Sequence, residues 1–451
     1  MFDSPQAIGK YGIEKLLFLK TISAKIHPVI YGVSRLFSQS KISNLKPKMA
    51  TAILEVEISK LPPEITVEER YSKALILIRL HGKPIGQALF HVVGGRIGGD
   101  ELRKTLRNCA GENLWKNLLY DTLKWDERGP VEALPLATVA VCTRDRPEDL
   151  RRTLDALMLL PDDGQEYLVI DNCPSTDATK ELVKNYPQVR YVREDLPGSS
   201  AARNRALCEA KHEFVALTDD DAAPDPNWLR SLLWNFSDPR VMCVTGLVMP
   251  LELETEAQEW FECYSPHGRG FERRVLDGAH CNPLIVHLVG VSASMALRKS
   301  SIDYIGLFDE ALGAGTPTVG GEDCELFARI LRAGYCIVYE PRALSWHRHR
   351  RTWEELRKTL QGYGIGVYAF WTRMFVINRE FSVPLLAWGW LRYKQIPELI
   401  ASWRKQPGCI PSDLLLAQLR GCIRGPMAYF SSRKRLREVK GEVNRLRDFR
   451  F

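Results

Sequence analysis

The sequence predicts an α/β protein built on a doubly wound, mostly parallel sheet, with a small N-terminal α/β module and a helical C-terminal region. From residue 137 onward, short apolar runs alternate with amphipathic helical segments, which is typical of parallel strands joined by helical crossovers. Acidic residues directly follow two of these runs. The last hundred residues are basic and rich in aromatic side chains, unlike the segments before them.

The charge of the chain is unevenly distributed. The 451 residues leave room for two or three domains, and their net charge of +7 divides into +6 for residues 1–48, −13 for 49–341 and +14 for 342–451. An acidic body with basic ends is not the footprint of a nucleic-acid binder, so we expect no nucleic-acid partner. It fits a metal in the middle and an anionic membrane surface at the end, or a solvated tail without function.

The cysteines and the N-terminus favour a cytoplasmic protein, and the basic, aromatic-rich C-terminal region suggests that it is peripheral at the inner face of the membrane. Eleven cysteines without a Cys-x-x-Cys pair argue against a disulfide framework or a zinc ribbon. The apolar run at 16–19 is short and interrupted by lysines, so we expect no signal peptide. We expect residues 1–48 to be poorly ordered, and Met49 is an alternative start.

Residues 50–125 predict a small α/β module of unknown role. Strand patterns cover 53–58, 74–80 and 85–93, and helical patterns cover 101–109 and 114–123. Residues 126–136, with one glycine and two prolines, form a predicted linker.

The main domain is expected over residues 137–350. Its first half contains predicted strands at 138–142, 167–170, 189–192 and 214–218, with helices from Pro147, at 175–185, 199–210 and 228–235. Its second half contains predicted strands at 241–248, 289–297 and 336–339, an irregular excursion at 250–284 and a helix at 322–333. Asp171 and Asp219 both fall just past a strand, so one crevice can contain both.

Asp219, Asp220 and Asp221 follow the fourth strand as three consecutive carboxylates. Like charges side by side repel, and none can be buried unpaired. A divalent cation at the C-terminal end of the strand would relieve the repulsion. A solvated acidic loop that caps the helix at Pro226 is the alternative.

Other polar residues near strand ends suggest a nucleotide site. Thr143 and Arg146 can hold phosphates, and Asp171 can accept a hydrogen bond from a base or cap a helix. Arg203 can hold the acidic cluster in place or meet a pyrophosphate. No Gly-x-Gly-x-x-Gly follows a strand and no P-loop is present, which disfavours a Rossmann dehydrogenase and a P-loop enzyme.

Two further groups are candidates. Glu322 and Asp323 follow two glycines at a helix N-terminus, where acids either complement the helix dipole or act as a general base on a mobile loop. His347 and His349 alternate among arginines and are either surface residues or a source of one imidazole ligand for Mn²⁺ or Mg²⁺.

Together these residues resemble the motif series of the family 2 glycosyltransferases over residues 137–350. The series comprises Thr143–Pro147, Asp171-Asn172 with Asp177, Gly198 with Arg203-Asn204, Asp219–Asp221, Phe308-Asp309, Gly321–Asp323 and His347. The resemblance implies a GT-A fold with a mixed, mostly parallel sheet. It also implies an inverting, metal-dependent reaction with a nucleotide-sugar donor and a glycan or lipid-linked acceptor, in polysaccharide biosynthesis at the cell envelope.

The resemblance also assigns roles to individual residues. It implies nucleotide-sugar binding by Thr143, Arg146, Asp171, Arg203, Asp219 and Asp220, a metal (Mn²⁺ or Mg²⁺) on Asp221, Asp219 and His347, and Asp323 or Glu322 as catalytic base. Arg144-Asp145 and Cys173-Pro174 depart from the family pattern, which leaves the donor base and sugar open. The absence of Gln-x-x-Arg-Trp, the signature of processive synthases, favours single additions.

Residues 351–451 form the basic, aromatic-rich helical region. No uncharged run reaches the roughly 20 residues that a spanning helix needs. The region therefore predicts either an interfacial membrane segment or a helical packing domain with a buried aromatic face.

Two other functions remain alternatives. A sugar-nucleotide nucleotidyltransferase would need a glycine-rich loop after the first strand, and Thr143–Pro147 contains no glycine. A non-catalytic glycan- or membrane-binding protein with a relic site is disfavoured by the retention of all the acids.

Overall fold

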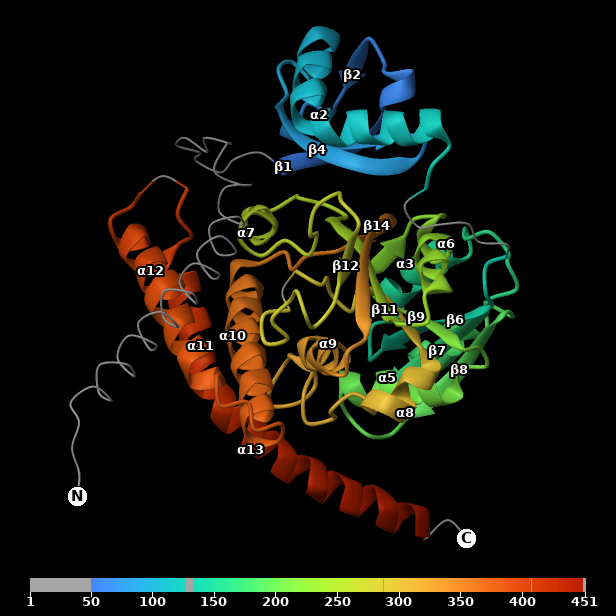
Figure 1. The fold of residues 1–451 in the computed structure, drawn as a ribbon, viewed down its shortest axis with the longest axis vertical. Helices are drawn as coiled ribbons and strands as arrows, with labels where there is room; N and C mark the ends of the chain where they lie inside the picture. Colours follow the sequence, from blue (N-terminus) through green and yellow to red (C-terminus); the bar gives the residue numbers. More distant parts are fainter. Residues whose placement is uncertain (1–49, 127–132, 287, 407, 449–451) are drawn as a thin grey trace, which may run out of the picture. The chain divides into compact units, whose positions relative to one another are not determined.

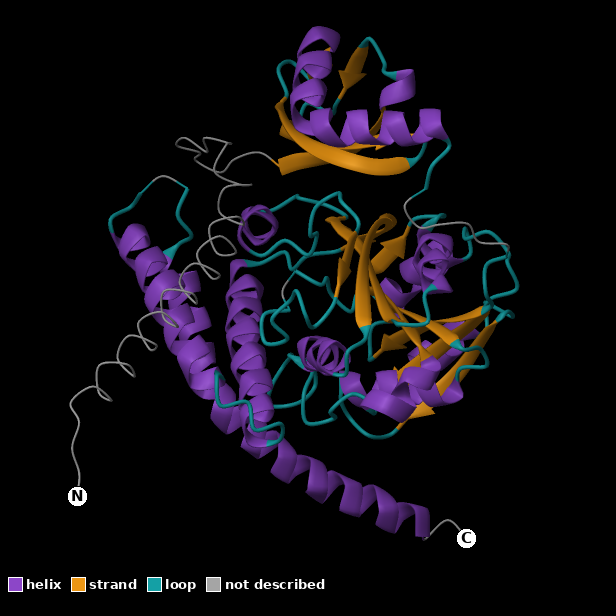
Figure 2. Cartoon of the chain, in the orientation of Figure 1, coloured by secondary structure: helices purple, strands orange, loops and turns teal. Residues whose placement is uncertain are grey.

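The computed structural model describes residues 50–126, 133–286, 288–406 and 408–448 (Figure 1). The described chain falls into two compact units, residues 50–385 with 413–448, and residues 386–412. The predicted segment 1–48 and residues 127–132 of the predicted linker lie outside the described residues. Figure 2 shows two groups of strands, each accompanied by helices, followed by a C-terminal region that is helical where described.

The N-terminal module is a three-stranded sheet with one long helix, α2 (Gly99–Leu123). Its strands β1 (Ala50–Glu57), β3 (Tyr71–Leu80) and β4 (Lys83–His91) lie in the order β1-β3-β4, with β1 parallel and β4 antiparallel to β3. Strands β2 (Glu64–Thr66) and β5 (Arg96–Gly98) pair separately. The prediction of two helices is wrong, because the interior of one continuous helix tolerates Gly111 at a modest cost.

Strand β3 is buried on both faces, which explains its continuous apolar run. Alternate residues enter the core of the module, among them Ala74, Ile76 and Ile78. Leu75 and Leu77 point the other way and pack with four residues of the main domain, Leu247, Met249, Leu253 and Leu344. The module therefore packs directly against the main domain through this strand.

A mixed, mostly parallel sheet forms the centre of the main domain, as predicted. Nine of the described strands belong to it: β6 (Ala137–Thr143), β7 (Glu166–Asn172), β8 (Val189–Glu194), β9 (Phe214–Asp219), β10 (Ala222–Pro224), β11 (Val241–Pro250), β12 (Arg274–Leu276), β13 (Ser294–Arg298) and β14 (Cys336–His347). Their order is β10-β14-β11-β13-β9-β6-β7-β8, with β12 paired to β14. Strands β9, β6, β7 and β8 are mutually parallel, and β13 is antiparallel to its neighbours β9 and β11.

Helices cover this sheet and connect its strands. The connecting helices are α3 (Pro147–Leu157), α4 (Ala178–Val183), α5 (Ser199–Glu209), α6 (Trp228–Leu233), α7 (Glu256–Tyr264), α8 (Ile302–Ile305) and α9 (Glu322–Arg332). The predicted apolar face of α3, made by Leu150, Leu154 and Leu157, packs with Trp228 of α6 in one core on the sheet. Helix α5 instead brings small residues against β6 and β7, among them Ala201 and Ala202, both buried.

The strand order opens a crevice at the C-terminal ends of β6 and β9. The chain runs from β6 to β7 and β8 on one side and then returns to β9 on the other, so the connections leave this point in opposite directions. Ligands of open α/β sheets bind at such a point. Cys142 and Asp219 are register partners there, which places Thr143 beside the acidic cluster.

Three predicted elements of the main domain differ from the structure. The strand predicted at 289–297 is shorter, because β13 begins at Ser294. Strand β14 was predicted to end at residue 339, but it continues to His347 because it pairs along its length with β11 and at its end with β10. The predicted irregular excursion at 250–284 contains α7 and the short strand β12. Helix α7 begins with a capping box in which Thr255 and Gln258 bond reciprocally, a local signal that indicates a helix start.

The C-terminal region is helical, as predicted. Helix α10 (Trp353–Val376) crosses α13 (Ser412–Asp448) at glycines: a Cβ on Gly364 would lie 2.2 Å from the carbonyl oxygen of Gln418, and one on Gly421 would lie 2.1 Å from that of Gln361. Phe370 and Trp371 of α10 are buried, so this part of the predicted aromatic segment is a packing face.

The second unit contains most of α11 (Val383–Trp390), a π-helical turn (Leu391–Gln395) and α12 (Ile396–Trp403). Throughout the described residues, every helix is too short or too polar to cross a bilayer.

Candidate active site

The three consecutive aspartates lie at the end of β9, and their environments differ. Asp219 remains 36% exposed, whereas Asp220 and Asp221 are buried. Asp220 accepts hydrogen bonds from the Thr143 hydroxyl at 2.7 Å and from Arg146 at 2.6 Å. The solvated-loop alternative is therefore wrong for Asp220 and Asp221, which lie inside a network of partners.

Arg146 pairs with both buried aspartates. Its second guanidinium nitrogen lies 2.8 Å from Asp221 and 3.0 Å from Asp149. Burial raises the pKa of Asp220 to about 7, with Asp221 adding to the rise and Arg146 opposing it. Thr143 and Arg146 thus hydrogen-bond to the buried aspartates. Their predicted contact with the donor phosphates stays a prediction.

His347 links the acids to the end of β14. Its Nε2 lies 3.0 Å from Asp221 and 3.9 Å from Asp219. Burial by itself would raise the pKa of Asp221, but the charges of His347 and Arg146 outweigh burial and hold that pKa low. Burial would likewise lower the pKa of His347, but Asp221 outweighs burial and raises it.

Asp219, Asp221 and His347 fit a divalent cation. Each offers one ligand atom, and these atoms all lie within 4.8 Å of one another. Two carboxylates and one imidazole match the ligand preferences of Mn²⁺, and the carboxylates suit Mg²⁺. Because Asp221 is held ionised, it can bind a cation without first losing a proton.

Arg203 joins the β9 acids to the acids of α9. It is buried and lies 2.7 Å from Glu322 and 3.5 Å from Asp219. Ser199 at the start of α5 donates a further hydrogen bond to Glu322 at 3.2 Å. Of the two predicted roles of Arg203, holding the acidic cluster is the one that these contacts support.

Two glycines allow the segment before α9 to lie close to α10 and α5. Gly321 precedes the helix with a φ of +92°, and a Cβ there would lie 2.4 Å from the carbonyl oxygen of Gly366 in α10. Gly313 has a φ of +107°, and a Cβ there would lie 2.4 Å from the Ser199 hydroxyl. Both positions need glycine for backbone conformation and for space, so they fix where the α9 acids lie.

Asp323 follows Glu322 and differs from it in its contacts. Its carboxylate accepts a hydrogen bond from the Cys324 amide at 2.7 Å. Burial, with the neighbouring Glu322 charge, raises the pKa of Asp323, whereas Arg203 opposes the rise. Asp323 and Asp219 both interact electrostatically with Tyr363 of α10, so the acids of β9 and of α9 converge on one region.

Asp171 is the last but one residue of β7, which lies next to β6 in the sheet. Its carboxylate is fully buried and accepts one hydrogen bond, from the Tyr191 hydroxyl at 2.9 Å. Its other oxygen, Oδ1, is buried without a hydrogen-bond partner among the described residues. Burial raises the pKa of Asp171. An acceptor without a donor at this edge of the sheet is compatible with the predicted contact to a nucleobase.

Sequence reasoning missed part of this neighbourhood. His267 comes from the segment after α7, and its Nε2 lies 3.1 Å from the Tyr363 hydroxyl. No motif marks His267 in the sequence, and the connection to α10 depends entirely on tertiary packing. His349 was noted as a possible ligand, and the structure places its Nε2 3.1 Å from Glu262 of α7.

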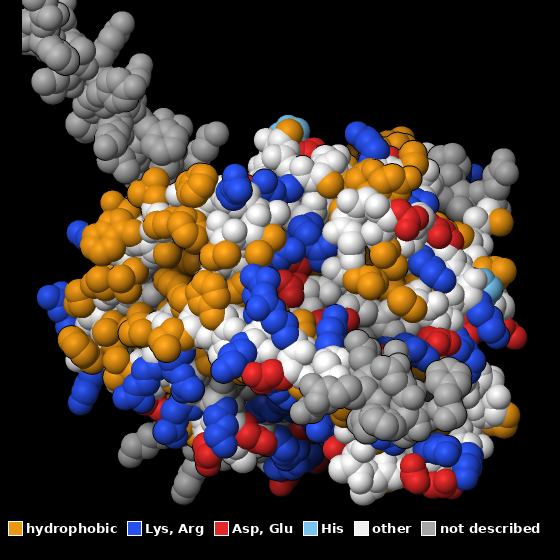
Figure 3. Space-filling view, turned by 90° about the horizontal axis from the view of Figure 1, so that it is seen from below, with side chains coloured by type: hydrophobic (Ala, Val, Ile, Leu, Met, Phe, Trp, Pro, Cys, Tyr) orange, Lys and Arg blue, Asp and Glu red, His pale blue; other side chains and the backbone are white. Residues whose placement is uncertain are grey.

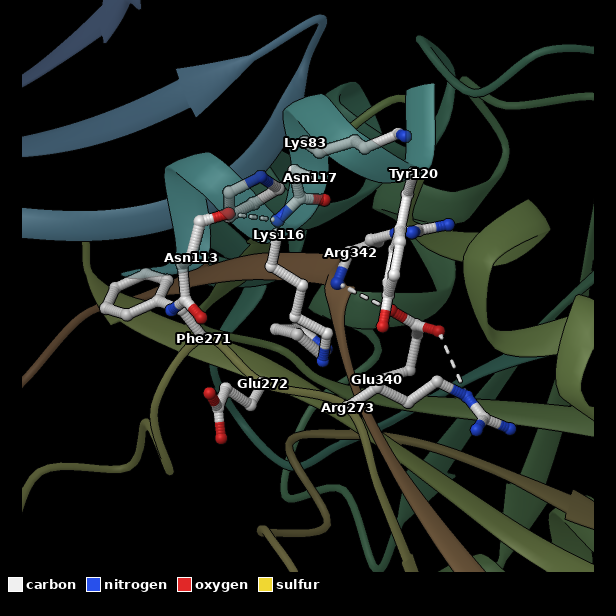
Figure 4. Close-up of a pocket in the computed structure, with 12 residues that line it drawn as sticks. Lys83, Asn113, Lys116, Asn117, Tyr120, Phe271, Glu272, Arg273, Glu340 and Arg342 are labelled. Atoms are coloured by element: carbon white, nitrogen blue, oxygen red, sulfur yellow. Dashed lines mark hydrogen bonds and ion pairs between the residues drawn. The ribbon is translucent and has the colours of Figure 1, made fainter. Parts of the chain in front are cut away.

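A separate small pocket lies where the N-terminal module meets the main domain (Figure 4). Lys83 and Tyr120 line it from the module, and Arg273, Glu340 and Arg342 line it from the main domain. The buried Glu340 accepts a hydrogen bond from the Arg342 amide at 3.0 Å and pairs with Arg273 at 3.8 Å. The acids of β9 and α9 do not line this pocket.

Comparisons with known proteins show which family part of the chain resembles. Residues 138–304 match the model of glycosyl transferase family 2. A stretch of 218 residues, 47% of this chain, is 31% identical to the pre-mycofactocin glycosyltransferase of Mycobacterium tuberculosis but covers only 43% of that relative. The probable glycosyltransferase YdaM of Bacillus subtilis is 23% identical over 57% of this chain and 61% of its own length.

Further matches include another curated relative and a solved structure. The O-antigen chain rhamnosyltransferase RfbN of Salmonella typhimurium is 26% identical over 42% of this chain and 58% of its own. Among solved structures, the mannosyltransferase PcManGT from Pyrobaculum calidifontis, in complex with GDP-Man and Mn²⁺, aligns with 68% of this chain and 94% of its own at 16% identity and a TM-score of 0.45.

Proposed function

Because the chain belongs to glycosyltransferase family 2, we propose that it transfers one sugar from a nucleotide-diphosphate donor to a hydroxyl of a glycan or lipid-linked acceptor, with inversion at the anomeric carbon. The observation that carries the proposal is the convergence of acids from β9 and α9 around Arg203 and His347. Such a cluster at the sheet's C-terminal edge suits a ligand with a diphosphate and its cation.

The metal in this proposal is Mn²⁺ or Mg²⁺ on Asp219, Asp221 and His347. When bound, it supplies the positive charge that stabilises the departing nucleoside diphosphate. The residues around it act as positioning residues. Thr143 and Arg146 hold the buried aspartates, so the carboxylates are oriented before the donor arrives.

Asp323 is the proposed general base, and Glu322 positions Arg203. Glu322 already accepts hydrogen bonds from Arg203 and Ser199. The pKa of Asp323 is raised, which makes its carboxylate a stronger base. Asp323 takes the proton from the acceptor hydroxyl, the hydroxyl oxygen bonds to the anomeric carbon, and the bond to the diphosphate breaks with its electron pair. A positioned base of this kind contributes roughly 10²–10⁴-fold.

Asp171 is the proposed contact for the donor base. Its unpaired Oδ1 would gain a hydrogen bond from a base N–H, which removes the cost of a buried acceptor without a donor. Asp219, the most exposed of the three aspartates at the end of β9, is the proposed contact for the ribose side as well as for the cation.

The test is a transfer assay with a panel of nucleotide sugars and Mn²⁺, in which released nucleoside diphosphate is measured. Release of a diphosphate supports glycosyl transfer, whereas formation of pyrophosphate from a sugar phosphate and a nucleoside triphosphate would support the nucleotidyltransferase. Asp323→Asn should lower turnover by at least about 100-fold while the protein still binds donor. Product NMR should show an inverted anomeric configuration, and retention would contradict the proposed base.

We also propose that the enzyme is cytoplasmic and peripheral at the inner face of the membrane, where it would build cell-envelope polysaccharide. Helices α11 and α12 and the turn between them expose large apolar side chains: Leu385, Trp388, Tyr393, Ile396, Ile400 and Trp403. Figure 3 shows hydrophobic side chains gathered at one end of the face seen from below. Arg392, Lys394, Arg404 and Lys405 lie within the same stretch of sequence, which fits an anionic interface.

Vesicle sedimentation tests this membrane proposal. The protein should pellet with anionic vesicles at low salt, and Trp388→Ser with Trp403→Ser should release it. The matched control is Trp115→Ser in α2, where an equally exposed tryptophan lies in the N-terminal module. Equal release by the control, or no pelleting of the parent protein, contradicts the proposal.

A further inference from the structure

Three imidazole rings gather beside the acidic cluster. His267 comes from the segment after α7, His347 ends β14, and His349 follows two residues later. Their ring centroids lie 5.0 Å (His267–His347), 5.5 Å (His267–His349) and 5.7 Å (His347–His349) apart. One ligand nitrogen from each ring lies within 4.8 Å of the other two.

One nitrogen of each ring has a partner and the other does not. The Nε2 atom of His267 lies 3.1 Å from the Tyr363 hydroxyl. The Nε2 atom of His347 lies 3.0 Å from Asp221, and that of His349 lies 3.1 Å from Glu262. All three Nδ1 atoms are buried and have no hydrogen-bond partner among the described residues. A carboxylate only accepts, so the Nε2 atoms of His347 and His349 donate, and a lone pair is left on Nδ1 when the ring is neutral.

Aromatic packing accounts for only part of this arrangement. The ring of Phe261 lies 5.1 Å from that of His267 and 4.4 Å from that of His349, so the imidazoles contribute to an apolar cluster. Packing alone would be better served by phenylalanine, because a buried nitrogen without a partner destabilises the fold. Three such nitrogens, on rings whose centroids lie 5.0–5.7 Å apart, would all gain a partner from one shared ligand.

We propose that the Nδ1 atoms of His267, His347 and His349, a set named here the histidine trio, bind a Zn²⁺-type transition-metal ion. Ligand nitrogens 2.0–2.1 Å from a tetrahedral Zn²⁺ stand about 3.4 Å apart. One nitrogen of each ring lies within 4.8 Å of the other two, so the three rings are near enough to share one ion after a modest closure. Imidazole ligands suit Zn²⁺, whereas the neighbouring carboxylates suit Mg²⁺ or Mn²⁺.

The partners of the Nε2 atoms have the form of an outer ligand shell. Metal-binding histidines almost always donate their other N–H to a carboxylate, a carbonyl or a water, which fixes the ring and raises its basicity. Asp221 and Glu262 occupy these positions for His347 and His349, and Tyr363 does so for His267. The two carboxylates also offset the charge of the ion.

The trio shares His347 with the proposed donor site but uses its other nitrogen. A ring that binds an ion through Nδ1 still donates from Nε2 to Asp221. When the trio holds its ion, the donor's cation would therefore keep Asp219 and Asp221 as ligands and lose His347. The inference does not depend on glycosyl transfer, because the trio binds its ion without a nucleotide.

Co²⁺ binding to the full-length protein, stripped with a chelator, tests the proposal. We expect one bound Co²⁺ with the visible absorption of a tetrahedral ion, displaced by one equivalent of Zn²⁺ and retained in excess Mn²⁺. His267→Phe should weaken Co²⁺ binding by more than the roughly 10–100-fold typical of losing an outer-shell partner. Glu262→Gln, which leaves the three rings in place, should weaken it by roughly 10–100-fold.

Two controls separate the trio from the carboxylate site. His280→Phe changes an exposed histidine outside the trio and should leave Co²⁺ binding unchanged. Asp219→Asn removes a carboxylate ligand of the donor's cation and should leave the tetrahedral spectrum intact. No bound Co²⁺ in the parent protein, or binding that survives in His267→Phe and disappears in Asp219→Asn, overturns the proposal.

Discussion

Removal of the Arg203 charge should destabilise the main domain strongly. Arg203→Met keeps much of the side-chain volume but leaves Glu322, itself 7% exposed, with the hydrogen bond from Ser199 at 3.2 Å as its one remaining side-chain partner among the described residues. Removing one partner of a buried ion pair costs about 3–5 kcal/mol, because the remaining charge is buried without compensation. At roughly 2–4 °C per kcal/mol, the midpoint of thermal unfolding should fall by roughly 6–20 °C.

Urea denaturation, with thermal unfolding in parallel, measures this effect. The double variant Arg203→Met with Glu322→Gln should recover much of the loss, because no unpaired charge then remains in the interior. Arg152→Met is the matched control: Arg152 pairs with Asp149 at 2.6 Å but is 51% exposed, so its loss should stay within about 0.5 kcal/mol. A loss below about 1 kcal/mol in Arg203→Met, or no recovery in the double variant, would refute the reasoning.

Three further predictions follow from the same contacts. Burial raises the pKa of Asp220 from 3.8 to about 7, so the contribution of Asp220 to stability is full below pH 4 and is lost as pH rises toward 7. Asp220→Asn should therefore make the free energy of unfolding depend less on pH between 4 and 7. An unchanged pH dependence in denaturation curves would contradict this prediction. Gly421→Val should unfold the contact of α10 with α13, measured by faster proteolysis near α13, because the added Cβ meets a backbone carbonyl; resistance equal to the parent would speak against the crossing. Asp171→Asn should weaken binding of a nucleoside diphosphate by roughly tenfold in calorimetry, and unchanged affinity would remove Asp171 from the site.

The sequence predicts the parallel half of the sheet well. Strands β6, β7 and β9 are mostly apolar and buried, and β8, at the edge of the sheet, is only partly buried. Helices separate all four, so their pattern and the acids at their ends can be predicted locally. The antiparallel insertion of β13 between β9 and β11 and the extension of β14 depend on which distant strand supplies hydrogen bonds. Such pairing cannot be predicted from the strand's own residues.

The candidate site could be predicted for its acids but not for their partners. The negative charges of three adjacent aspartates repel one another, so the sequence itself indicates that positive charge must lie nearby. The sequence does not show which residues supply the positive charge. Arg146 pairs with Asp220 and Asp221, and Arg203 pairs with Asp219 and Glu322. These pairings depend on how the loops close over the sheet. His267 and Tyr363 lie in segments without any motif, so only the fold brings them to His347.

Calorimetric titration of a nucleoside diphosphate, with and without Mn²⁺, tests the central claim most directly. The claim is that the acids of β9 and α9 share one site but divide its tasks between binding and proton transfer. Asp221→Asn should abolish the Mn²⁺-dependent part of binding, whereas Asp323→Asn should keep that binding and lose sugar transfer. Equal nucleotide affinity in the parent protein and in Asp221→Asn, with Mn²⁺ present, would contradict the account.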